Sequence, residues 1–206
     1  GSGFSYTEYV TAIEQLSILD PSIGLSMAAH NSLCSGHILQ FGNKEQKQKW
    51  LPKLAIAEWI GAWGLTEHNT GSDAASMATT AVKDGDEWVI NGHKIMTSNG
   101  QRADFLVVMC RTEDDDGDSG NANLKMTQII VPTDSPGLER VRSVPIWGHT
   151  GGDHMEIKYK DVRVPLENAL GARGSGHQAA QDRLGAGRVY HCMNTIGQMW
   201  RAFDIM

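Results

Sequence analysis

Apolar residues recur at two different spacings along the chain, and the changes of spacing divide it into three zones. In residues 5–58 they recur every three or four positions, which predicts helices. In residues 60–165 they gather in short runs rich in β-branched and aromatic residues, which predicts strands. From residue 176 onward the helical spacing returns. The pattern therefore predicts helices, then a sheet, then a helix.

Turn signals between the short runs indicate how the strands connect. Asp84-Gly85 and Asn91-Gly92 both stand between apolar runs, and the second is flanked by "WVI" and "HKIM". An Asn-Gly pair in that setting favours a tight two-residue hairpin. The acidic residues 113–123 predict a hairpin loop, because Ser119 and Lys125 stand where a calcium-binding loop needs glycine and glutamate. We expect an antiparallel sheet or barrel.

The last zone predicts one long helix, whose period is still running at Met206. About thirty residues of α-helix extend about 45 Å at 1.5 Å per residue. The apolar face of such a helix has to be buried against another surface. The first helical zone or a second subunit could supply that surface, or the chain could be a fragment of a longer protein.

Composition narrows the possible partners. The 206 residues include 18 basic and 24 acidic ones, a net charge of −6, which argues against a nucleic-acid-binding surface. No apolar run approaches the roughly twenty residues of a membrane span. Cys34, Cys110 and Cys192 are widely spaced in apolar surroundings, which predicts buried thiols in a reducing, intracellular compartment. Small molecules or other proteins are the expected partners.

The segment "GLTEHNTGSD", residues 64–73, lies at the boundary between the helical zone and the strands. It contains two acids and no lysine or arginine. The pattern predicts a strand that ends in a glycine-containing turn. Backbone N–H groups of Gly71-Ser72-Asp73, together with the serine hydroxyl, could cradle a phosphate. Alternatively, Ser72 or Asp73 could cap its own turn.

Four blocks of sequence, in order, resemble the flavin-dependent acyl-CoA dehydrogenases. They are "HNSLCSGHILQFGNKEQKQKWLPKLAIAEWIGAWGLTEHNTGSDAAS", "GDEWVINGHKIMTSNG", "KDVRVPLENALG" and the "GAGRV" of the last helix. The Thr-Glu and Gly-Ser-Asp residues of the first block are a signature of that family. Together the blocks cover the chain from about His30 to Met206.

The resemblance implies an α+β fold with N-terminal helices, a middle antiparallel β-barrel-like domain and the start of a C-terminal helical bundle. On this chain the three parts are expected at residues 1–59, 60–172 and 173–206. Family members are considerably longer. The resemblance therefore implies a fragment that lacks most of the C-terminal bundle.

The resemblance also implies a chemistry, the FAD-dependent α,β-dehydrogenation of an acyl-CoA thioester. In the family a carboxylate removes the α-proton, hydride leaves the β-carbon for the flavin, and the electrons pass to an electron-transferring flavoprotein. Homo-oligomers are implied, in a bacterial cytoplasm or a mitochondrial matrix. The chain-length preference of the substrate does not follow from the sequence.

Site residues follow from the same match. The residue matched to the flavin pyrimidine edge is Thr66, the one near the flavin N5 is Ser98, and Ser72 matches a serine near the pyrophosphate and the coenzyme A moiety. Arg188 matches an arginine at the substrate end of the last helix. The expected cofactor-binding residues are Trp63, Gly64, Leu65, Thr66, Gly71, Ser72, Met96, Thr97 and Ser98, and the expected substrate-binding residues are Ser72 and Arg188. Each hydroxyl could instead be an ordinary strand hydroxyl, Met96 a core residue, and Arg188 a surface arginine.

Some positions depart from the family pattern. His68-Asn69-Thr70 replaces a segment such as Pro-Gly-Ala, and Gly185 replaces an aspartate. In some members the catalytic base directly precedes the arginine matched by Arg188, but this chain has Gly187 there. The carboxylates Asp182 and Glu156 fall on no catalytic position.

The catalytic base is therefore expected beyond Met206, and the chain alone is expected to be inactive on acyl-CoA. No residue within the 206 is assigned to proton abstraction. His68, His149 and His154 are expected to be structural or solvent-facing, with no nucleophile or metal partner.

Two alternatives use the same scaffold differently. An acyl-CoA oxidase would return the electrons to oxygen, which oxygen consumption would reveal. A non-catalytic module would bind acyl-CoA or a partner protein without flavin.

Overall fold

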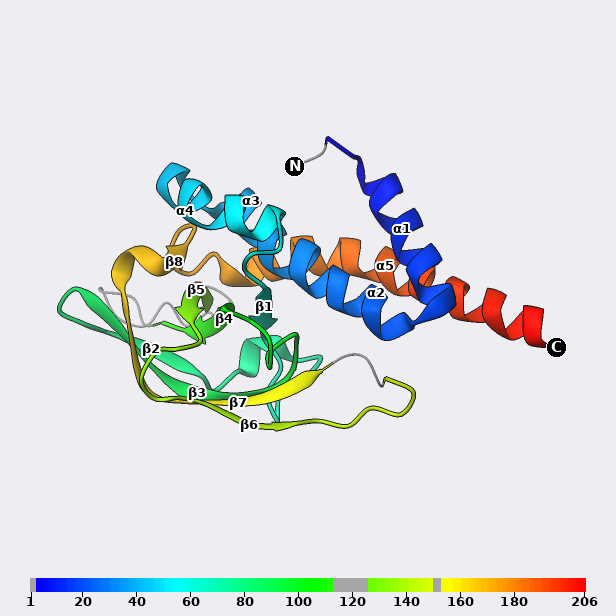
Figure 1. Ribbon diagram of the computed structural model, residues 1–206. Helices are drawn as coiled ribbons and strands as arrows, with labels where there is room; N and C mark the ends of the chain where they lie inside the picture. Colours follow the sequence, from blue (N-terminus) through cyan, green and yellow to red (C-terminus); the bar gives the residue numbers. More distant parts are fainter. Residues whose placement is uncertain (1–2, 113–125, 150–152) are drawn as a thin grey trace.

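Helices cover one side of an eight-stranded sheet in this computed structural model, which describes residues 3–112, 126–149 and 153–206 (Figure 1). The predicted loop at residues 113–123 lies outside the described residues. The α+β class and the order of helices, sheet and helix are confirmed. Of the helices in these ranges, none has the length and apolar character needed to cross a bilayer.

Local signals begin most of the N-terminal helices. Ser5 and Glu8 form a capping box at the start of the first helix, and Asn43 and Gln46 form another. Asp20 caps the second helix, which begins with Pro21, a residue suited to the first helical position. The helices are α1 (Tyr6–Leu19), α2 (Pro21–Ala28), a π-helical segment (Ala29–Ser35), α3 (Gly36–Phe41) and α4 (Lys44–Ala55).

The sheet follows the order β6-β7-β3-β2-β4-β5-β8, with β1 paired to β4. It differs from the expected antiparallel barrel in two respects. Its described strands do not close into a barrel, and β1 and β2 each pair with β4 in parallel. The strands are β1 (Gly61–Gly64), β2 (Thr80–Asp84), β3 (Glu87–Ser98), β4 (Phe105–Arg111), β5 (Met126–Pro132), β6 (Leu138–Ser143), β7 (His154–Pro165) and β8 (Ala169–Leu170).

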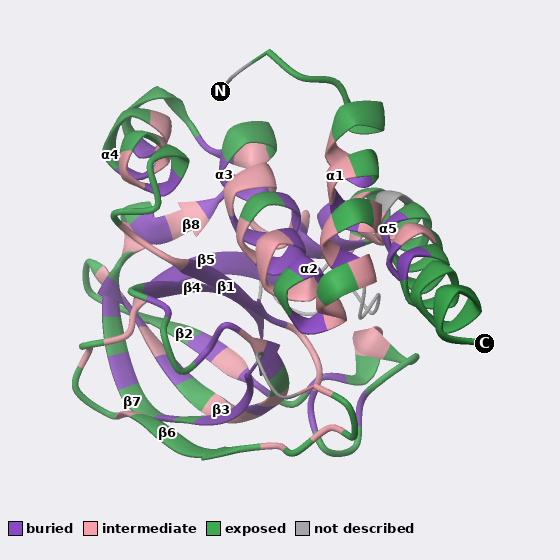
Figure 2. Cartoon of the chain, turned by 45° about the vertical axis from the view of Figure 1, so that its right-hand side comes forward, coloured by how far each residue is buried: buried purple, intermediate pink, exposed green. Residues whose placement is uncertain are grey.

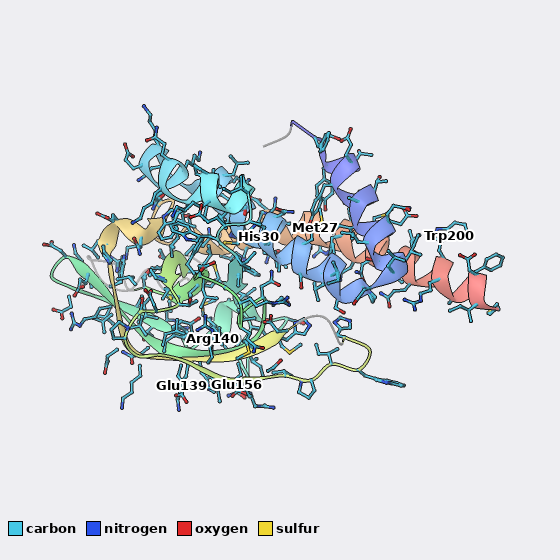
Figure 3. All side chains as sticks on the ribbon, viewed as in Figure 1. Met27, His30, Glu139, Arg140, Glu156 and Trp200 are labelled. Atoms are coloured by element: carbon cyan, nitrogen blue, oxygen red, sulfur yellow. The ribbon has the colours of Figure 1, made fainter. Side chains whose placement is uncertain are left out.

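A histidine joins the helices to β1. The His30 ring nitrogen Nε2 lies 3.0 Å from the carbonyl oxygen of Leu54 in α4, and the amide of Gly61 donates to Nδ1 at 3.2 Å. His30 therefore carries its proton on Nε2 and connects the π-helical segment, α4 and β1 (Figure 3). Figure 2 shows that the residues of β1, β4 and β5 beneath the helices are largely buried.

The last helix, α5 (Gly176–Ile205), spans 30 residues as the periodicity predicts. Part of it packs against α1 and α2, where Tyr190 is buried and the Asn194 amide donates to the Ser17 hydroxyl at 2.8 Å. The first helical zone therefore covers that part of the helix.

The far end of α5 is not covered in this way. Trp200 and Phe203 are 51% and 67% exposed, and Met206, which follows the helix, is 97% exposed (Figure 3). The first helical zone contacts α5 from Arg183, which donates to the Ser32 hydroxyl, to Arg201, which donates to the Leu19 carbonyl.

Two further predictions from sequence were wrong. The first concerns the thiols: Cys34 and Cys110 are buried, but Cys192 on α5 is exposed. The second concerns Asn91-Gly92, which makes no hairpin but lies within β3. The tight turn lies instead at Gly85 and the residue after it, between β2 and β3.

The structure shows why Asn91-Gly92 fits a strand. The register of β3 against β7 shifts at this point, so the pair belongs to an irregularity of the bulge type. The Asn91 side chain bonds both the backbone and the carboxylate of Asp161, a residue with φ of 50°. A Cβ at Gly92 would overlap the hydroxyl of Thr79. Close approach, and not a turn, explains this glycine.

We expect Gly92→Ala to lower the free energy of unfolding by about 1–3 kcal/mol, the usual cost of overpacking, because the added methyl group must displace Thr79. Urea denaturation of both proteins measures this. Gly71→Ala is the matched control, since a Cβ there meets no atom within 4 Å. Equal stability of the Gly92 variant and the parent would show that the strand accommodates a side chain.

Candidate functional site

A buried lysine holds the segment that follows β1. Lys94 of β3 is fully buried, and its ammonium donates to the Glu67 carboxylate at 2.8 Å and to the Leu65 carbonyl at 3.0 Å. Glu67 also accepts hydrogen bonds from the amides of Ala78 and Thr79, at 2.6 and 2.9 Å. Glu67, which has no basic neighbour within "GLTEHNTGSD", is therefore neutralised by Lys94, 27 positions later in the sequence.

The surroundings of Glu67 and Lys94 shift the pKa values of both groups. Burial raises the pKa of Glu67. The charge of Lys94 and the hydrogen bonds that the Glu67 carboxylate accepts lower this pKa by more, so it lies below its ordinary value of 4.5. Burial lowers the pKa of Lys94, whereas Glu67 opposes that shift. We assign an ionised pair, because the carboxylate accepts three charged or amide donors in a site closed to water.

The same loop lies against the end of β3. The amide of Ile95 donates to the carbonyl of Thr66 at 2.9 Å. Directly afterwards the β3–β7 register shifts between Lys94 and Thr97, and Met96 takes a φ of 61°. The shift turns the Met96 side chain outward, 40% exposed, and buries Thr97.

The structure thus brings together two predicted groups of residues, 63–66 and 96–98. Gly64 faces the side chains of Lys94 and Thr97, where a Cβ would lie 3.8 Å from the Thr97 hydroxyl. That hydroxyl is buried and has no partner among the described residues. A Cβ at position 64 would make ordinary van der Waals contacts with these side chains, so β1 and β3 are direct neighbours here.

Ser98 is held by a histidine pair. Its hydroxyl lies 3.0 Å from Nδ1 of His154, whose Nε2 lies 3.5 Å from Nδ1 of His149. Burial, and secondarily the charge of His149, lowers the pKa of His154, so its imidazole is neutral at pH 7. Its Nδ1 can therefore accept a hydrogen bond from the Ser98 hydroxyl. The contact shows His154 hydrogen-bonded to Ser98, and the expectation that His68, His149 and His154 are structural or solvent-facing stays a prediction.

The Gly71-Ser72-Asp73 turn is exposed. The Asp73 carboxylate accepts the hydroxyl proton of Ser76, and a single 3-10 turn (Ala74–Ser76) follows. Within the described residues, the Ser72 side chain makes no hydrogen bond. Asp73 therefore organises the turn, and no described contact joins Ser72 to the groups at 63–66 and 96–98.

A cavity of about 230 Å³ lies between α2, the π-helical segment, β1 and α5. Trp63 lines it from β1, and the Trp63 indole N–H is buried without a partner among the described residues. Arg183 on α5 donates to the Ser32 hydroxyl at the same cavity. No aspartate or glutamate is among its described lining residues, which include Leu25, Leu33, Trp63, Arg183, Arg188 and His191.

Two predicted residues, Trp63 and Arg188, therefore meet at this cavity. Sequence reasoning missed Glu67, Lys94, Arg183 and His191. An acid without local basic neighbours was a signal for Glu67, and a lysine between apolar strand residues was a signal for Lys94. Arg183 and His191 give no such signal, because only the packing of α5 against the π-helical segment places them there.

Comparisons with known proteins agree with this architecture. Residues 1–58 match the acyl-CoA dehydrogenase N-terminal domain, and residues 62–162 match the acyl-CoA dehydrogenase middle domain. A mitochondrial isovaleryl-CoA dehydrogenase from Pongo abelii is 34% identical over 99% of this chain and 48% of its own length. The chain spans about half the length of the curated relatives it matches.

Two solved structures extend the likeness to the fold. An acyl-CoA dehydrogenase from Geobacillus kaustophilus superimposes with a TM-score of 0.93 at 32% identity, over 99% of this chain and 53% of that one. An acyl-CoA dehydrogenase complexed with FAD, from Bacillus anthracis, has a TM-score of 0.90 at 32% identity, over 100% of this chain and 34% of that one.

Removing the buried ammonium should destabilise the fold strongly. We expect Lys94→Met to lower the free energy of unfolding by about 3–5 kcal/mol, because Glu67 is left as a buried charge without its ion partner. Urea denaturation checks this, with the exposed Lys83→Met on β2 as control, for which about 0.5 kcal/mol or less is expected. Equal effects of the two substitutions would contradict the assignment.

The acid limb of the stability curve should depend on Glu67. A carboxyl group whose folded pKa lies below its unfolded value stabilises the protein above the unfolded value, here 4.5, and this contribution is lost as the pH falls through the folded pKa. We therefore expect the free energy of unfolding of Glu67→Gln to fall less than that of the parent protein as the pH is lowered from 5. Unfolding free energies of both proteins across that range test this, and an unchanged slope would contradict it.

Proposed function

Because the chain belongs to the acyl-CoA dehydrogenase family, we propose that it forms the flavin-binding and part of the acyl-binding region of an FAD-dependent acyl-CoA dehydrogenase. The observation that carries the proposal is the meeting of residues 63–66 with residues 96–98 beside a cavity. These two segments are the ones that the family resemblance matches to the flavin.

The residues at this meeting point fit a flavin. Met96 offers an exposed apolar side chain directly after Ile95, whose amide donates to the Thr66 carbonyl, and the Thr66 hydroxyl makes no hydrogen bond within the described residues. His154 orients the Ser98 hydroxyl on the adjoining strand end. When bound, FAD supplies the electron acceptor of the reaction. The backbone of residues 63–66 and the side chains of Thr66, Met96 and Ser98 would hold its ring system, and Gly71 and Ser72 its phosphates.

The cavity is suited to an acyl group. Leu25, Leu33 and Trp63 provide an apolar lining, and Arg183 and Arg188 stand at the α5 side of the cavity. An acyl chain would lie among the apolar residues, while Arg188 and Ser72 would bind polar parts of coenzyme A. The arginine positive charges suit the phosphates of that moiety. Chain length and branching of the acyl group stay open.

The described residues offer this cavity no carboxylate base. No described acid lines it, and Asp182 instead accepts a hydrogen bond from Gln178 at 2.8 Å on the exposed side of α5. Glu156 is bound by Arg142 and two histidines. The location of the base beyond Met206 stays a prediction. We propose that the residues present bind and orient, and that the proton-abstracting group comes from outside the 206 residues.

Partners follow from the same proposal. The two electrons must leave the enzyme after each turnover, and an electron-transferring flavoprotein is the proposed acceptor. Homo-oligomers are proposed as well, and a bacterial cytoplasm or a mitochondrial matrix is the proposed location.

Flavin binding can be tested on the chain itself. We expect added FAD to remain with the folded protein after gel filtration, seen by its visible absorption and a circular dichroism spectrum. Thr66→Ala and Ser98→Ala should each raise the Kd for FAD roughly 3- to 10-fold, the effect of one lost hydrogen bond. Thr195→Ala, on an exposed position of α5, is the control and should leave the Kd unchanged. A folded chain that retains no FAD would contradict the proposal.

A further inference from the structure

Three side chains that the proposed function does not use converge on the outer face of the sheet. His68 follows β1, His93 lies on β3 and Glu156 lies on β7. The Nε2 atoms of His68 and His93 lie 3.1 and 2.9 Å from the same carboxylate oxygen, Oε1 of Glu156. In Figure 3, Glu156 lies at the lower edge of the sheet, away from the helices.

Hydrogen bonding alone does not account for this arrangement. Nε2 of His93 is buried and lies 2.9 Å from Oε1, yet it makes no hydrogen bond. The centroids of the His68 and His93 imidazole rings are 4.8 Å apart, so the two rings are in edge-on contact. The Nε2 atoms of His68 and His93 both lie beside one carboxylate oxygen, and His93 makes no hydrogen bond to it, which is an arrangement that a shared cation would stabilise.

The donor set is one that zinc uses. Two histidine nitrogens and a glutamate oxygen make a three-ligand site with a free coordination position. The three ligand atoms lie within 4.8 Å of one another. A tetrahedral zinc ion with ligand bonds of about 2.0–2.2 Å needs ligand atoms about 3.3 Å apart. The two measured separations, 3.1 and 2.9 Å, differ from this by only a few tenths of an ångström.

The surroundings of the three side chains also suit a metal. Arg142 donates to the other carboxylate oxygen, Oε2, at 2.6 Å and so orients Oε1 toward the histidines. Hydrogen bonds of this kind to a ligating carboxylate are usual around metal sites. The His68 and His93 side chains are 45% and 36% exposed, so both rings reach the surface, while the His93 Nε2 atom and the Glu156 side chain, which is 8% exposed, lie beneath it.

We propose that His68, His93 and Glu156 form a binding site for one divalent transition-metal ion, with Zn²⁺ as the best-fitting ion and water in the remaining position. Bound metal would connect the loop after β1 to β3 and β7. That loop also carries Thr66 and Ser72, so the ion would restrain it without taking part in the oxidation.

The test uses the 206-residue chain without a histidine tag, freed of metal with EDTA and dialysed. Isothermal titration calorimetry with ZnCl₂ should give one ion per chain, and the melting temperature should rise with added zinc. Each of His68→Ala, His93→Ala and Glu156→Gln should weaken zinc binding at least about 100-fold, beyond the 10- to 100-fold typical of residues that only support a ligand.

His149→Ala is the matched control, because His149 is a neighbouring histidine outside the three-residue set and contacts His154 instead. It should leave the zinc affinity within about 3-fold of the parent, since it removes no ligand. Circular dichroism confirms folding of each variant. If His93→Ala or Glu156→Gln fails to fold, His68→Ala decides alone, because this side chain is the most exposed of the three.

The proposal is overturned by absence of zinc binding to the parent, by equal affinity of the parent and His68→Ala, or by an equal loss in His149→Ala. Replacement of zinc by Co²⁺ adds an independent readout, since the visible absorption of cobalt reports its ligand geometry. A cobalt spectrum that is identical in the parent and in His68→Ala would also overturn the proposal.

Discussion

The ion pair between Lys94 and Glu67 is the constraint on which the candidate site depends. Both groups lie in the interior, where a charge without a partner is costly, so each restricts where the other can be. Lys94 also donates to the Leu65 carbonyl and the Met77 sulfur, and Glu67 also accepts hydrogen bonds from the amides of Ala78 and Thr79. The chain after β1 must therefore cross the end of β3 in one position.

The register shift of β3 between Lys94 and Thr97 lies directly after the buried ion pair. In a regular strand, side chains alternate between the two faces, so an inward Lys94 would be followed by an inward residue 96. Here Thr97 points inward instead, and Met96 takes a left-handed backbone conformation that is unusual for a residue with a side chain. The result is an exposed apolar side chain at Met96, directly after the residue that donates to the Thr66 carbonyl. Strain of this kind persists only where the surrounding contacts determine the backbone.

Local patterns in the sequence predicted the elements better than their connections. The 30-residue helix α5 follows from spacing alone, because an amphipathic period needs no information about partners. Asn91-Gly92 has the composition of a hairpin turn, but its use is decided by Thr79 and Asp161, which lie far away in the sequence. The family resemblance selected residues 63–66 and 96–98. It could not supply the Lys94 pair or the histidines beside Ser98, since those depend on contacts across the sheet.

The two faces of β3 contact neighbouring residues, Glu67 and His68, of the loop that follows β1. Lys94 points to the inner face and holds Glu67, whereas His93, the preceding residue, lies on the outer face with His68 and Glu156. Consecutive strand residues point to opposite faces. Glu67 therefore contacts Lys94 on the inner face, and its neighbour His68 lies with His93 on the outer face. The Lys94–Glu67 contact is buried, and the contact of His68 and His93 with Glu156 is partly exposed. A ligand that reaches the outer contact would therefore act on the same short loop that presents Thr66 and Ser72, without any change in the core.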